Sequence, residues 1–535
     1  MFRYLISHLL NELGWMLCPI FLAVAWLFWR VWVFKIRRAF HKDEVDMLPY
    51  SIPILGEPEY PKATVAFAYF GPTRQPYGLC VAGQRLIVVT HPKHKAEIYR
   101  NNEAYSYDPF INLAYKRVGN IADSTLEILW RKGSEGFASL YPNPKQKVLV
   151  HTGVDLFYKQ LLSPGPFQDL VDTVAPNIER RLRWEAFAPT TVISKVAATK
   201  VVSLHRWVRD VAIGAQTCSF FGPHLEEQMP EFTTVYDKYD INSWMATYQY
   251  PAFMAKAVTV PREKVVKGIT DYLDTPREKR GGGVAFVNEL EEEMRHAGLD
   301  TDTCARVLFI ILWGTNSNVQ MTTFWCMVHL MSDASLMASI RTEIEPFMTA
   351  ATQNGDKFAA EPLRLGLSES CPLLNSLFHE VLRFYNTGSS VRQTTREVQI
   401  SGRWCVPADC TILLPRRHLL LDPAVFGTDA NIVDPYRFLR DRELERHEYY
   451  EPWGQGITRC SGKAIGSFEA LSFIAWALWR YEFRVVGAGE RAADGETVGT
   501  AGLPRIDLKK PSLGMSKQVE GDDMVVEVTQ RALEK

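Results

Sequence analysis

One cysteine near the C-terminus has surroundings that suit metal chemistry. It is Cys460, in the loop WGQGITRCSG at residues 453–462, and an apolar stretch directly after it predicts a helix over about 463–481. The free N–H groups and positive dipole end of a helix start favour a thiolate over a thiol. Glycines at Gly456 and Gly462 let the backbone bend closely around a large flat ligand. Because a thiolate held in this way can be the axial ligand of heme iron, we predict heme b bound through Cys460.

The competing interpretation of Cys460 is a structural cysteine in a turn. Two further groups of residues argue against it. Glu380 and Arg383 lie in an apolar stretch that predicts a helix over about 373–385, and a spacing of three places both charges on one helical face. Charged residues on such a face are rarely buried unless they are paired. The turn sequence DPYRF, residues 434–438, supplies another arginine, Arg437.

The second group is a polar patch inside a long apolar segment. Residues from about 303 to 331 predict one long helix, and the sequence TNSN at 315–318 interrupts its apolar character. An apolar helix of this length belongs in a protein core. Polar side chains in its middle therefore need a partner or a function.

These motifs, taken together, resemble the heme-thiolate cytochrome P-450 family. The cysteine loop of that family reads Phe-x-x-Gly-x-x-x-Cys-x-Gly, and residues 453–462 follow it with Trp in place of Phe. Glu380, Arg383 and Arg437 match its buried Glu-Arg-Arg network, and 315–318 matches its oxygen-activating helix. The motifs appear in the family's order over nearly the whole chain. The resemblance implies a mainly α fold with a smaller β region, the cytochrome P-450 fold, with the three network residues in a structural role.

The resemblance also implies which residues contact the cofactor. Arg392 follows the Glu-x-x-Arg helix at the family's usual distance, where a strand arginine binds a heme propionate through its planar guanidinium. The family commonly has Arg or His two positions before the cysteine, but this chain has Thr458 there and Arg459 next to Cys460. Which basic group meets a propionate is therefore left open. The predicted cofactor-binding residues are Cys460, Arg392, Trp453, Gly456, Arg459 and Gly462.

The long helix departs from the family pattern, which is Ala/Gly-Gly-x-Asp/Glu-Thr-Thr. The aligned residues 313–318 read WGTNSN, so Asn316 stands for the acid and Asn318 for the alcohol that steers protons, while Gly314 leaves space. An asparagine cannot donate a proton as an acid does, but it can hold a water molecule. We predict Asn316, Asn318 and Gly314 as the catalytic residues. Asparagine at the alcohol position is similar to the branch with sterol 7α- and 12α-hydroxylases and prostacyclin synthase, as is the loop around Trp453.

Composition limits the classes of partner. The chain has 535 residues, 47% hydrophobic and 12% aromatic, which is ample for one large core, and its net charge is −1. No overall field favours nucleic acid, so no nucleic acid partner is expected. The sequence contains no nucleotide-binding glycine motif. It therefore carries no flavin or nicotinamide domain of its own, and the electrons are expected from a separate NADPH-cytochrome reductase.

The N-terminal segment has the composition of a membrane anchor. Residues 13–34 form an apolar run of about the length that one crossing needs, and Lys35, Arg37, Arg38 and Lys42 follow it. Basic residues on that side place the downstream chain in the cytoplasm. We therefore predict a single-pass membrane protein of the endoplasmic reticulum with its catalytic domain facing the cytoplasm. A cleaved signal peptide and a buried core helix are the alternatives, and no small-residue cleavage site follows the run.

These observations divide the chain into three parts. Residues 1–34 are the predicted anchor, with a transmembrane segment over about 13–34, and residues 35–56 are a basic, proline-bearing hinge. Residues 57–535 form the predicted heme-thiolate catalytic domain.

The function that follows is a membrane-anchored heme-thiolate monooxygenase. It would insert one oxygen atom from dioxygen into a small apolar substrate, such as a steroid, terpenoid or polyketide-like molecule in a biosynthetic pathway of secondary metabolism. One alternative is a heme-thiolate isomerase or dehydratase that uses no dioxygen, because the acid and alcohol are missing from the long helix. A non-catalytic heme protein is the other alternative.

Overall fold

A computed structural model describes residues 20–40, 43–50, 74–132 except 82, 139–353 except 142, 144 and 249, 360–486, 490–491, 497–498, and 502–532 except 511 and 513. The chain divides into two compact units. The first, called here the sheet unit, comprises Met1–Phe110, Ser389–Leu419 and Gln455–Thr458. The second, called the helical unit, comprises Ile111–Gly388, Leu420–Gly454 and Arg459–Lys535. Each unit is described by itself.

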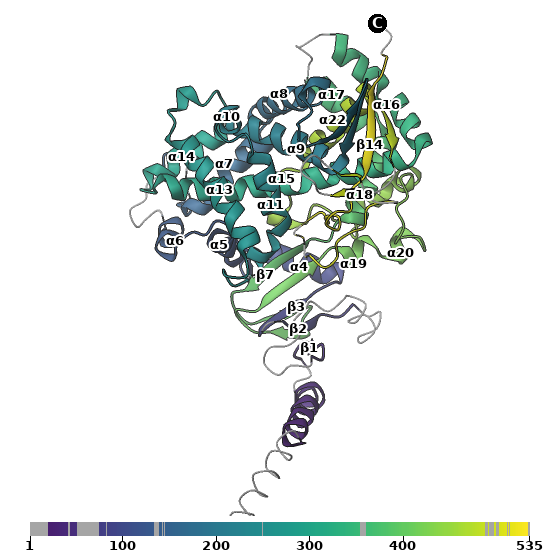
Figure 1. The fold of residues 1–535 in the computed structure, drawn as a ribbon. Coiled ribbons are helices and arrows are strands. Elements are labelled where there is room, and N and C mark those ends of the chain that lie inside the picture. The colour runs from purple at the N-terminus through teal and green to yellow at the C-terminus, as the bar shows by residue number, and fades with distance from the viewer. Residues whose placement is uncertain are drawn as a thin grey trace, which may run out of the picture. The chain divides into compact units, whose positions relative to one another are not determined.

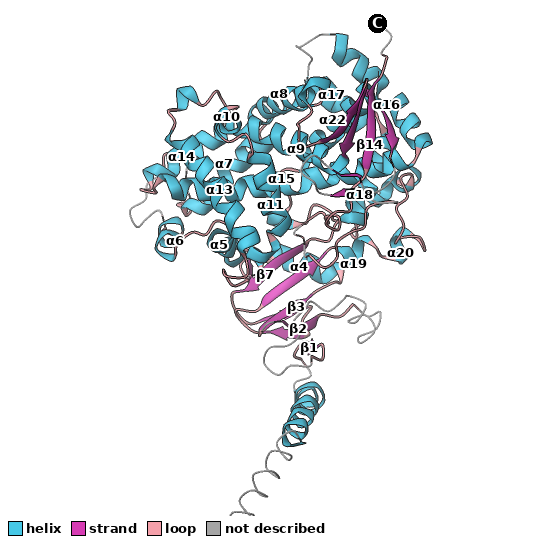
Figure 2. Cartoon of the chain, viewed as in Figure 1, coloured by secondary structure: helices cyan, strands magenta, loops and turns pink. Residues whose placement is uncertain are grey.

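The sheet unit is built on one six-stranded sheet, drawn with magenta arrows in Figure 2. Its order is β1 (Asp46–Met47), β2 (Tyr77–Val81), β3 (Gln84–Val88), β10 (Thr411–Pro415), β7 (Ser389–Thr394) and β4 (Tyr105–Ser106). The β1–β2 and β3–β10 pairs are parallel, and the other pairs are antiparallel. Strands β2 and β3 form an antiparallel hairpin.

One face of this sheet packs on a helix. Buried and half-buried residues alternate along β7, which is the period of two that a half-buried strand requires. Ile87 and Ile412 on the strands join Ile98 and Tyr99 in one apolar cluster. Ile98 and Tyr99 belong to α4 (Pro92–Arg100), whose N-cap His91 accepts a hydrogen bond from the Lys93 N–H. A small hairpin of β8 (Val398–Ile400) and β9 (Trp404–Val406) completes the described part of this unit after residue 74.

The helical unit is organised around α15 (Thr301–Ser332), which Figure 1 shows among the other helices of that unit. Buried side chains point out on several sides of α15, as expected for a helix surrounded by others. The Asp300 carboxylate accepts the Thr303 N–H and caps its start, so the predicted helix over 303–331 is confirmed with two additional residues at its beginning. The helices in contact with α15 include α9 (Leu204–Phe221), α13 (Lys256–Asp274), α14 (Ala285–His296), α16 (Ala334–Gln353), α18 (Pro372–Tyr385) and α22 (Lys463–Arg480).

The remaining elements of the helical unit lie around this core. They include α7 (Leu149–Leu162), α8 (Pro164–Arg181), α11 (Phe232–Asn242) and α12 (Trp244–Thr247). An antiparallel four-stranded sheet has the order β11 (Tyr481–Val485), β14 (Val525–Gln530), β6 (Thr199–Ser203) and β5 (Val192–Val196). The prediction of a mainly α fold with a smaller β region is confirmed.

The described N-terminal residues are helical over 20–40, including a π-helical turn at Trp32–Ile36. No helix within the described residues is both long enough and apolar enough to span a membrane. Part of the predicted 13–34 segment, residues 13–19, lies outside them. The predicted hinge over 35–56 begins as helix up to Phe40 and contains strand β1, while its residues 41–42 and 51–56 are likewise outside the described part.

Candidate active site

The cysteine loop closes on itself before α22. The Cys460 N–H donates to the Trp453 carbonyl at 2.9 Å, and Gly462 is the N-cap of α22, which begins at Lys463. Cys460 itself is exposed, so its thiol is presented at the surface of the loop rather than packed in the core. This geometry contradicts the interpretation of a buried structural cysteine. It agrees with a thiol placed at the positive end of a helix.

A tyrosine that sequence reasoning did not select lies near this thiol. Burial raises the pKa of the Tyr158 phenol on α7, and the negative charge of Cys460 raises it further. Lys147, from the same region, forms an ion pair with Asp155 at 2.6 Å. Tyr158 carries no sequence motif, and only the fold brings α7 near the loop.

Gly456 is required by a close approach inside the sheet unit. Its φ is +63°, in the left-handed region that favours glycine, and a Cβ there would lie 3.1 Å from the Tyr99 carbonyl oxygen of α4. The glycine therefore lets this part of the loop rest on α4. Gly462 differs, because an added Cβ would make only ordinary contact with Cys460 Sγ at 3.8 Å.

Arg392 on β7 is a buried cation, with a side chain only 1% exposed. Its guanidinium donates to the Thr458 hydroxyl at 2.7 Å and to the Val391 carbonyl at 2.8 Å, and it lies over the rings of Tyr99 and Tyr107. Burial lowers the pKa of this guanidinium. No ion pair joins it to a carboxylate among the described residues, and its Nε has no hydrogen-bond partner there.

The other predicted cofactor residues differ in their surroundings. The Trp453 ring packs against Phe378 at 6.5 Å between centroids, and its buried indole Nε1 has no partner among the described residues. Arg459 is exposed. Burial lowers the pKa of the Lys463 amine, and the positive charge of Arg459 lowers it further. Arg392 and Gly456 belong to the sheet unit, whereas Trp453, Arg459, Cys460 and Gly462 belong to the helical unit.

The predicted charge network is present. Glu380 and Arg383 are both fully buried and form a bidentate pair with two N–O distances of 2.7 Å. Arg437 Nε lies 3.3 Å from the same carboxylate. The Arg383 guanidinium also donates to the carbonyls of Leu420 and Ala430, so the network fixes the segment that leads to the cysteine loop. All of its polar contacts are internal, which indicates a structural role.

The three predicted residues of α15 lie on two different sides of the helix. Gly314 and Asn318 line one pocket, as a spacing of four predicts. The side-chain oxygen Oδ1 of Asn318 accepts a hydrogen bond from the backbone N–H of Met515, which belongs to the C-terminal segment 502–532. Asn316 is buried on the far side of the helix, facing α9 and α14, and donates to the Leu312 carbonyl at 3.2 Å. The structure therefore places Gly314 and Asn318 together and Asn316 apart from them.

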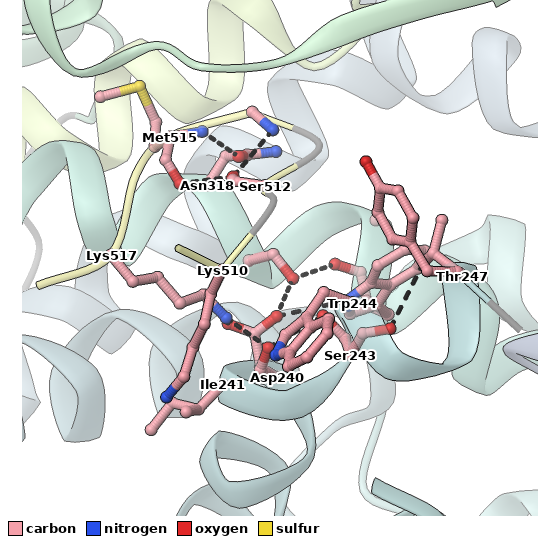
Figure 3. Close-up of a pocket in the computed structure, with 15 residues that line it drawn as sticks. Asp240, Ile241, Ser243, Trp244, Thr247, Asn318, Lys510, Ser512, Met515 and Lys517 are labelled. Carbon is pink, nitrogen blue, oxygen red and sulfur yellow. Dashed lines mark hydrogen bonds and ion pairs between the residues drawn. The ribbon is translucent and has the colours of Figure 1, made fainter. Parts of the chain in front are cut away.

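The pocket contains a buried acid that the sequence analysis missed (Figure 3). The carboxylate of Asp240, on α11, is 1% exposed and accepts from Ser317 at 2.5 Å and from Trp313 at 3.2 Å, both on α15. Lys517 of the C-terminal segment forms an ion pair with it at 2.5 Å. The sequence does contain a signal for it, because Asp240 lies on the same buried face of α11 as Tyr236 and Tyr239, where an unpaired acid is rare.

Three stretches of the chain form the walls of this pocket. Side chains from 240–248 form one wall, and residues from 313–318 of α15 form another. The third wall is the C-terminal segment, at Lys510, Ser512, Gly514, Met515 and Lys517. Gly514 passes so close to Asn318 that an added Cβ would collide with its side-chain oxygen.

Comparison with known proteins identifies the family. The family model described as cytochrome P-450 matches residues 190–501, more than half of the chain. Cytochrome P-450 monooxygenase nodJ of Hypoxylon pulicicidum is 22% identical over 466 residues, covering 84% of this chain and 85% of that protein. Prostacyclin synthase of Bos taurus is 25% identical over 210 residues, covering 36% of this chain and 41% of that protein. Cholesterol 7-alpha-monooxygenase of Cricetulus griseus is 21% identical over 348 residues, covering 59% and 66%.

The chain belongs to the cytochrome P-450 family and is an oxidoreductase of the monooxygenase class. The predicted relation to the branch with sterol 7α-hydroxylases and prostacyclin synthase is confirmed by the latter two relatives.

Membership of this family implies a heme with a cysteine thiolate ligand, and the residues present fit such a group. Cys460 offers an exposed thiol at a helix start. Arg392 is a buried guanidinium without a carboxylate partner, and a buried cation of this kind needs an anion. The Trp453 indole N–H is a buried donor without an acceptor. Each of these groups, taken by itself, fits a thiolate-ligated cofactor that carries carboxylates.

Proposed function

We propose that this chain is a membrane-anchored heme-thiolate monooxygenase that inserts one oxygen atom from dioxygen into a small, largely apolar substrate. The substrate class is a steroid, terpenoid or polyketide-like molecule of a biosynthetic pathway, and a separate NADPH-cytochrome reductase supplies the electrons. One observation carries the proposal. The exposed Cys460 thiol lies just before the start of α22. In the same loop, the Thr458 hydroxyl accepts a hydrogen bond from the buried guanidinium of Arg392, which forms no ion pair with a carboxylate among the described residues.

The cofactor would be heme b, which supplies the activation of dioxygen when bound. Cys460 would be the iron ligand, and Arg392 and the Trp453 indole would each hold a propionate. Gly456 keeps the loop against α4, and Gly462 is the N-cap of α22, so both glycines help to fix where the thiol lies. The exposed Arg459 would meet the cofactor only from the edge of the loop.

The protein groups that would handle substrate and protons lie around α15. Gly314 leaves space in the pocket, and Asn318 can hold a water molecule through the amide N–H that the Met515 contact does not use. Asn316 faces away from this pocket, so we propose for it a supporting role within α15.

The membrane anchor is proposed from the N-terminal residues. Over 20–40 the chain is helical, and apolar side chains such as Phe21, Leu27 and Phe28 are exposed on it. Exposed apolar residues in this density suit a lipid surrounding. A single-pass anchor in the endoplasmic reticulum, with the catalytic domain facing the cytoplasm, follows from the basic residues after residue 34.

A dioxygen-independent isomerase is the second candidate. The observation that favours it is the lack of an acid and an alcohol at Asn316 and Asn318, and one relative is named prostacyclin synthase. Labelled dioxygen distinguishes the two. The purified protein would be given reductase, NADPH, ¹⁸O₂ and the metabolite that accumulates when its gene is deleted. We expect a product with one ¹⁸O atom that forms only with NADPH. Unlabelled product formed without NADPH would establish the isomerase instead.

A further inference from the structure

The described N-terminal helix, drawn in purple in Figure 1, changes character along its length. Every residue over 20–28 is exposed, so this part is open on all sides. From residue 29 to residue 37 one side is half-buried, at 29, 30, 33, 34, 36 and 37. The change falls between Phe28, which is 65% exposed, and Trp29. The second part of the helix is therefore held against other parts of the protein, whereas the first part is not.

An aromatic cluster covers the half-buried side of this helix. The ring of Tyr50, which follows the helix in the chain, lies 5.4 Å from the Trp29 ring and 5.0 Å from the Phe34 ring, measured between centroids. The Trp29 and Phe34 rings meet edge to face at 5.8 Å. Aromatic rings attract one another in this arrangement. The three rings therefore hold the helix against the chain at residue 50.

The π-helical turn at Trp32–Ile36 favours this cluster. Trp29 and Phe34 are five residues apart, which in a regular α-helix would leave about 140° between them around the axis. In the π-helical turn the Arg37 N–H bonds to the Trp32 carbonyl, five residues back. A wider turn rotates less per residue, so it brings Phe34 nearer to the side of Trp29. This rare kind of turn is thus explained by the contact that it allows.

An ion pair links the helix to the same stretch of chain. Arg37 Nη2 lies 3.0 Å and 3.2 Å from the two carboxylate oxygens of Glu44. Both side chains are half-exposed, so this pair directs the helix more than it stabilises the fold. Glu44 is itself held, because it forms a β-bridge with Cys405 of β9, whose N–H donates to the Asp43 carbonyl at 2.6 Å.

The residues between Glu44 and Tyr50 belong to the six-stranded sheet. Strand β1 pairs with β2, and the Leu48 N–H donates to the Gly78 carbonyl at 2.8 Å. Burial raises the pKa of the Tyr50 phenol, and the neighbouring Cys80 on β2 raises it further. Tyr50 therefore contacts the helix with its ring and lies beside the sheet with its hydroxyl.

We propose that Trp29, Phe34, Arg37, Glu44 and Tyr50 form a clasp that mounts the N-terminal helix rigidly on the sheet unit. The lipid-facing part of the helix then ends near Phe28, and the sheet unit is held at one orientation to the membrane. This inference rests on the membrane anchor proposed above for the lipid around residues 20–28. None of the five side chains belongs to a buried apolar cluster, so the clasp orients the helix without being needed for the core.

The distance between two spin labels tests the clasp. Azidophenylalanine at the exposed positions Val24 and Gln84 would carry the labels without using any of the nine cysteines. The full chain would be measured in detergent micelles and in phosphatidylcholine nanodiscs. We expect one narrow distance distribution. In the double variant Arg37→Ala, Tyr50→Ala it should be about twofold wider, because the residues between the helix and β1 then act as a flexible linker.

Two further variants control for indirect effects. Phe40→Ala removes an aromatic ring of the same helix that is 78% exposed and outside the clasp, and it should keep the narrow distribution. Tyr50→Phe retains the ring that packs on Trp29 and Phe34, and it should also keep it. A wide distribution in the unmodified chain, or a narrow one that persists in the double variant, would overturn the proposal.

The accessibility of single labels in nanodiscs tests where the lipid-facing part ends. A label at Val24 should be reached by oxygen, which is concentrated in lipid, and a label at the exposed Lys35 by a water-soluble nickel complex. A label at Lys35 that behaves like the one at Val24 would contradict the end near Phe28. If the membrane anchor itself were wrong, the chain would not join the nanodiscs, while the distances in micelles would still decide whether the clasp exists.

Discussion

At the scale of single residues, the partner of a buried charge indicates its role. Glu380 and Arg383 are fully buried and satisfy one another with internal hydrogen bonds. Arg392 is equally buried, but its contacts are a hydroxyl, a carbonyl and two aromatic rings. A saturated pair stabilises structure, whereas a guanidinium without an anion is suited to a ligand.

The Glu380→Ala variant should fold poorly. Removing the Glu380 carboxylate leaves the buried charge of Arg383, and in part that of Arg437, without a counter-charge. This costs about 3–5 kcal/mol of folding free energy. We expect little folded, heme-loaded protein, measured by heme content and by urea unfolding. Glu443→Ala removes an exposed carboxylate and should behave like the unmodified protein. Normal heme content in Glu380→Ala would refute the structural role of the network.

Glu469 on α22 gives a pH prediction. Burial raises the pKa of its carboxyl from 4.5 to about 8, although Gln216 donates a hydrogen bond to it at 3.2 Å. Between those values the folded state keeps a proton that the unfolded state releases, so this group makes the free energy of unfolding fall as pH rises from 4.5 to about 8. Glu469→Gln should flatten that fall. Thermal unfolding at both ends of this window checks it, and an unchanged slope would count against a neutral Glu469.

At the scale of elements, side-chain contacts fix the C-terminal segment 502–532 to two helices, α11 and α15. Lys517 reaches the Asp240 carboxylate of α11, and Met515 binds Asn318 of α15. Gly514 permits this close approach, since a Cβ there would collide with Asn318. The wall of the pocket that holds Trp244 therefore depends on a segment far away in the chain.

Lys517→Met should loosen this segment. It leaves the 1% exposed Asp240 without its cation, and breaking such a pair costs about 3–5 kcal/mol. We expect a lower free energy of unfolding and faster amide hydrogen exchange within 502–532. Lys509→Met, at an exposed position nearby, is the control. Adding Asp240→Asn should recover part of the loss, because it removes the unpaired charge. Exchange equal to that of the control would show that the ion pair does not hold the segment.

Local patterns predicted some elements and missed others for physical reasons. Glu380 and Arg383 lie three residues apart on one helix, so helical periodicity was enough to pair them. The same periodicity could have separated Asn316 from Gly314, since two residues correspond to a rotation of about 200°. Asp240 and Lys517 are 277 residues apart, and the second lies in irregular backbone, where no period exists to reveal the contact.

At the scale of the whole molecule, we propose separate tasks for the N-terminal helix and for the rest of the chain. The described N-terminal helix over 20–40 exposes apolar side chains, while most of the buried apolar side chains of the helical unit belong to one large cluster. This contrast is what the proposed membrane anchor requires, because exposed apolar residues in this density suit a lipid surrounding.

Removing residues 1–34 tests this division. We expect the shortened protein to leave the membrane fraction in large part and still to bind heme, because the buried cluster of the helical unit contains none of residues 20–34, which are the described part of the removed segment. Sedimentation with membranes and heme content are the two measurements. Loss of heme binding and folding would mean that the segment is a core helix. Unchanged sedimentation would mean that another surface holds the protein on the membrane.

The central claim is that Cys460 is the ligand of a heme iron. The absorption spectrum of the reduced protein with carbon monoxide tests it most directly, because a thiolate ligand shifts the main heme band strongly to the red. We predict that band for the unmodified chain and its loss in Cys460→Ser, since an alcohol is a poor ligand for this iron. Cys410→Ser, at a buried cysteine of the sheet unit, should keep the band. A red-shifted band that persists in Cys460→Ser would contradict the account.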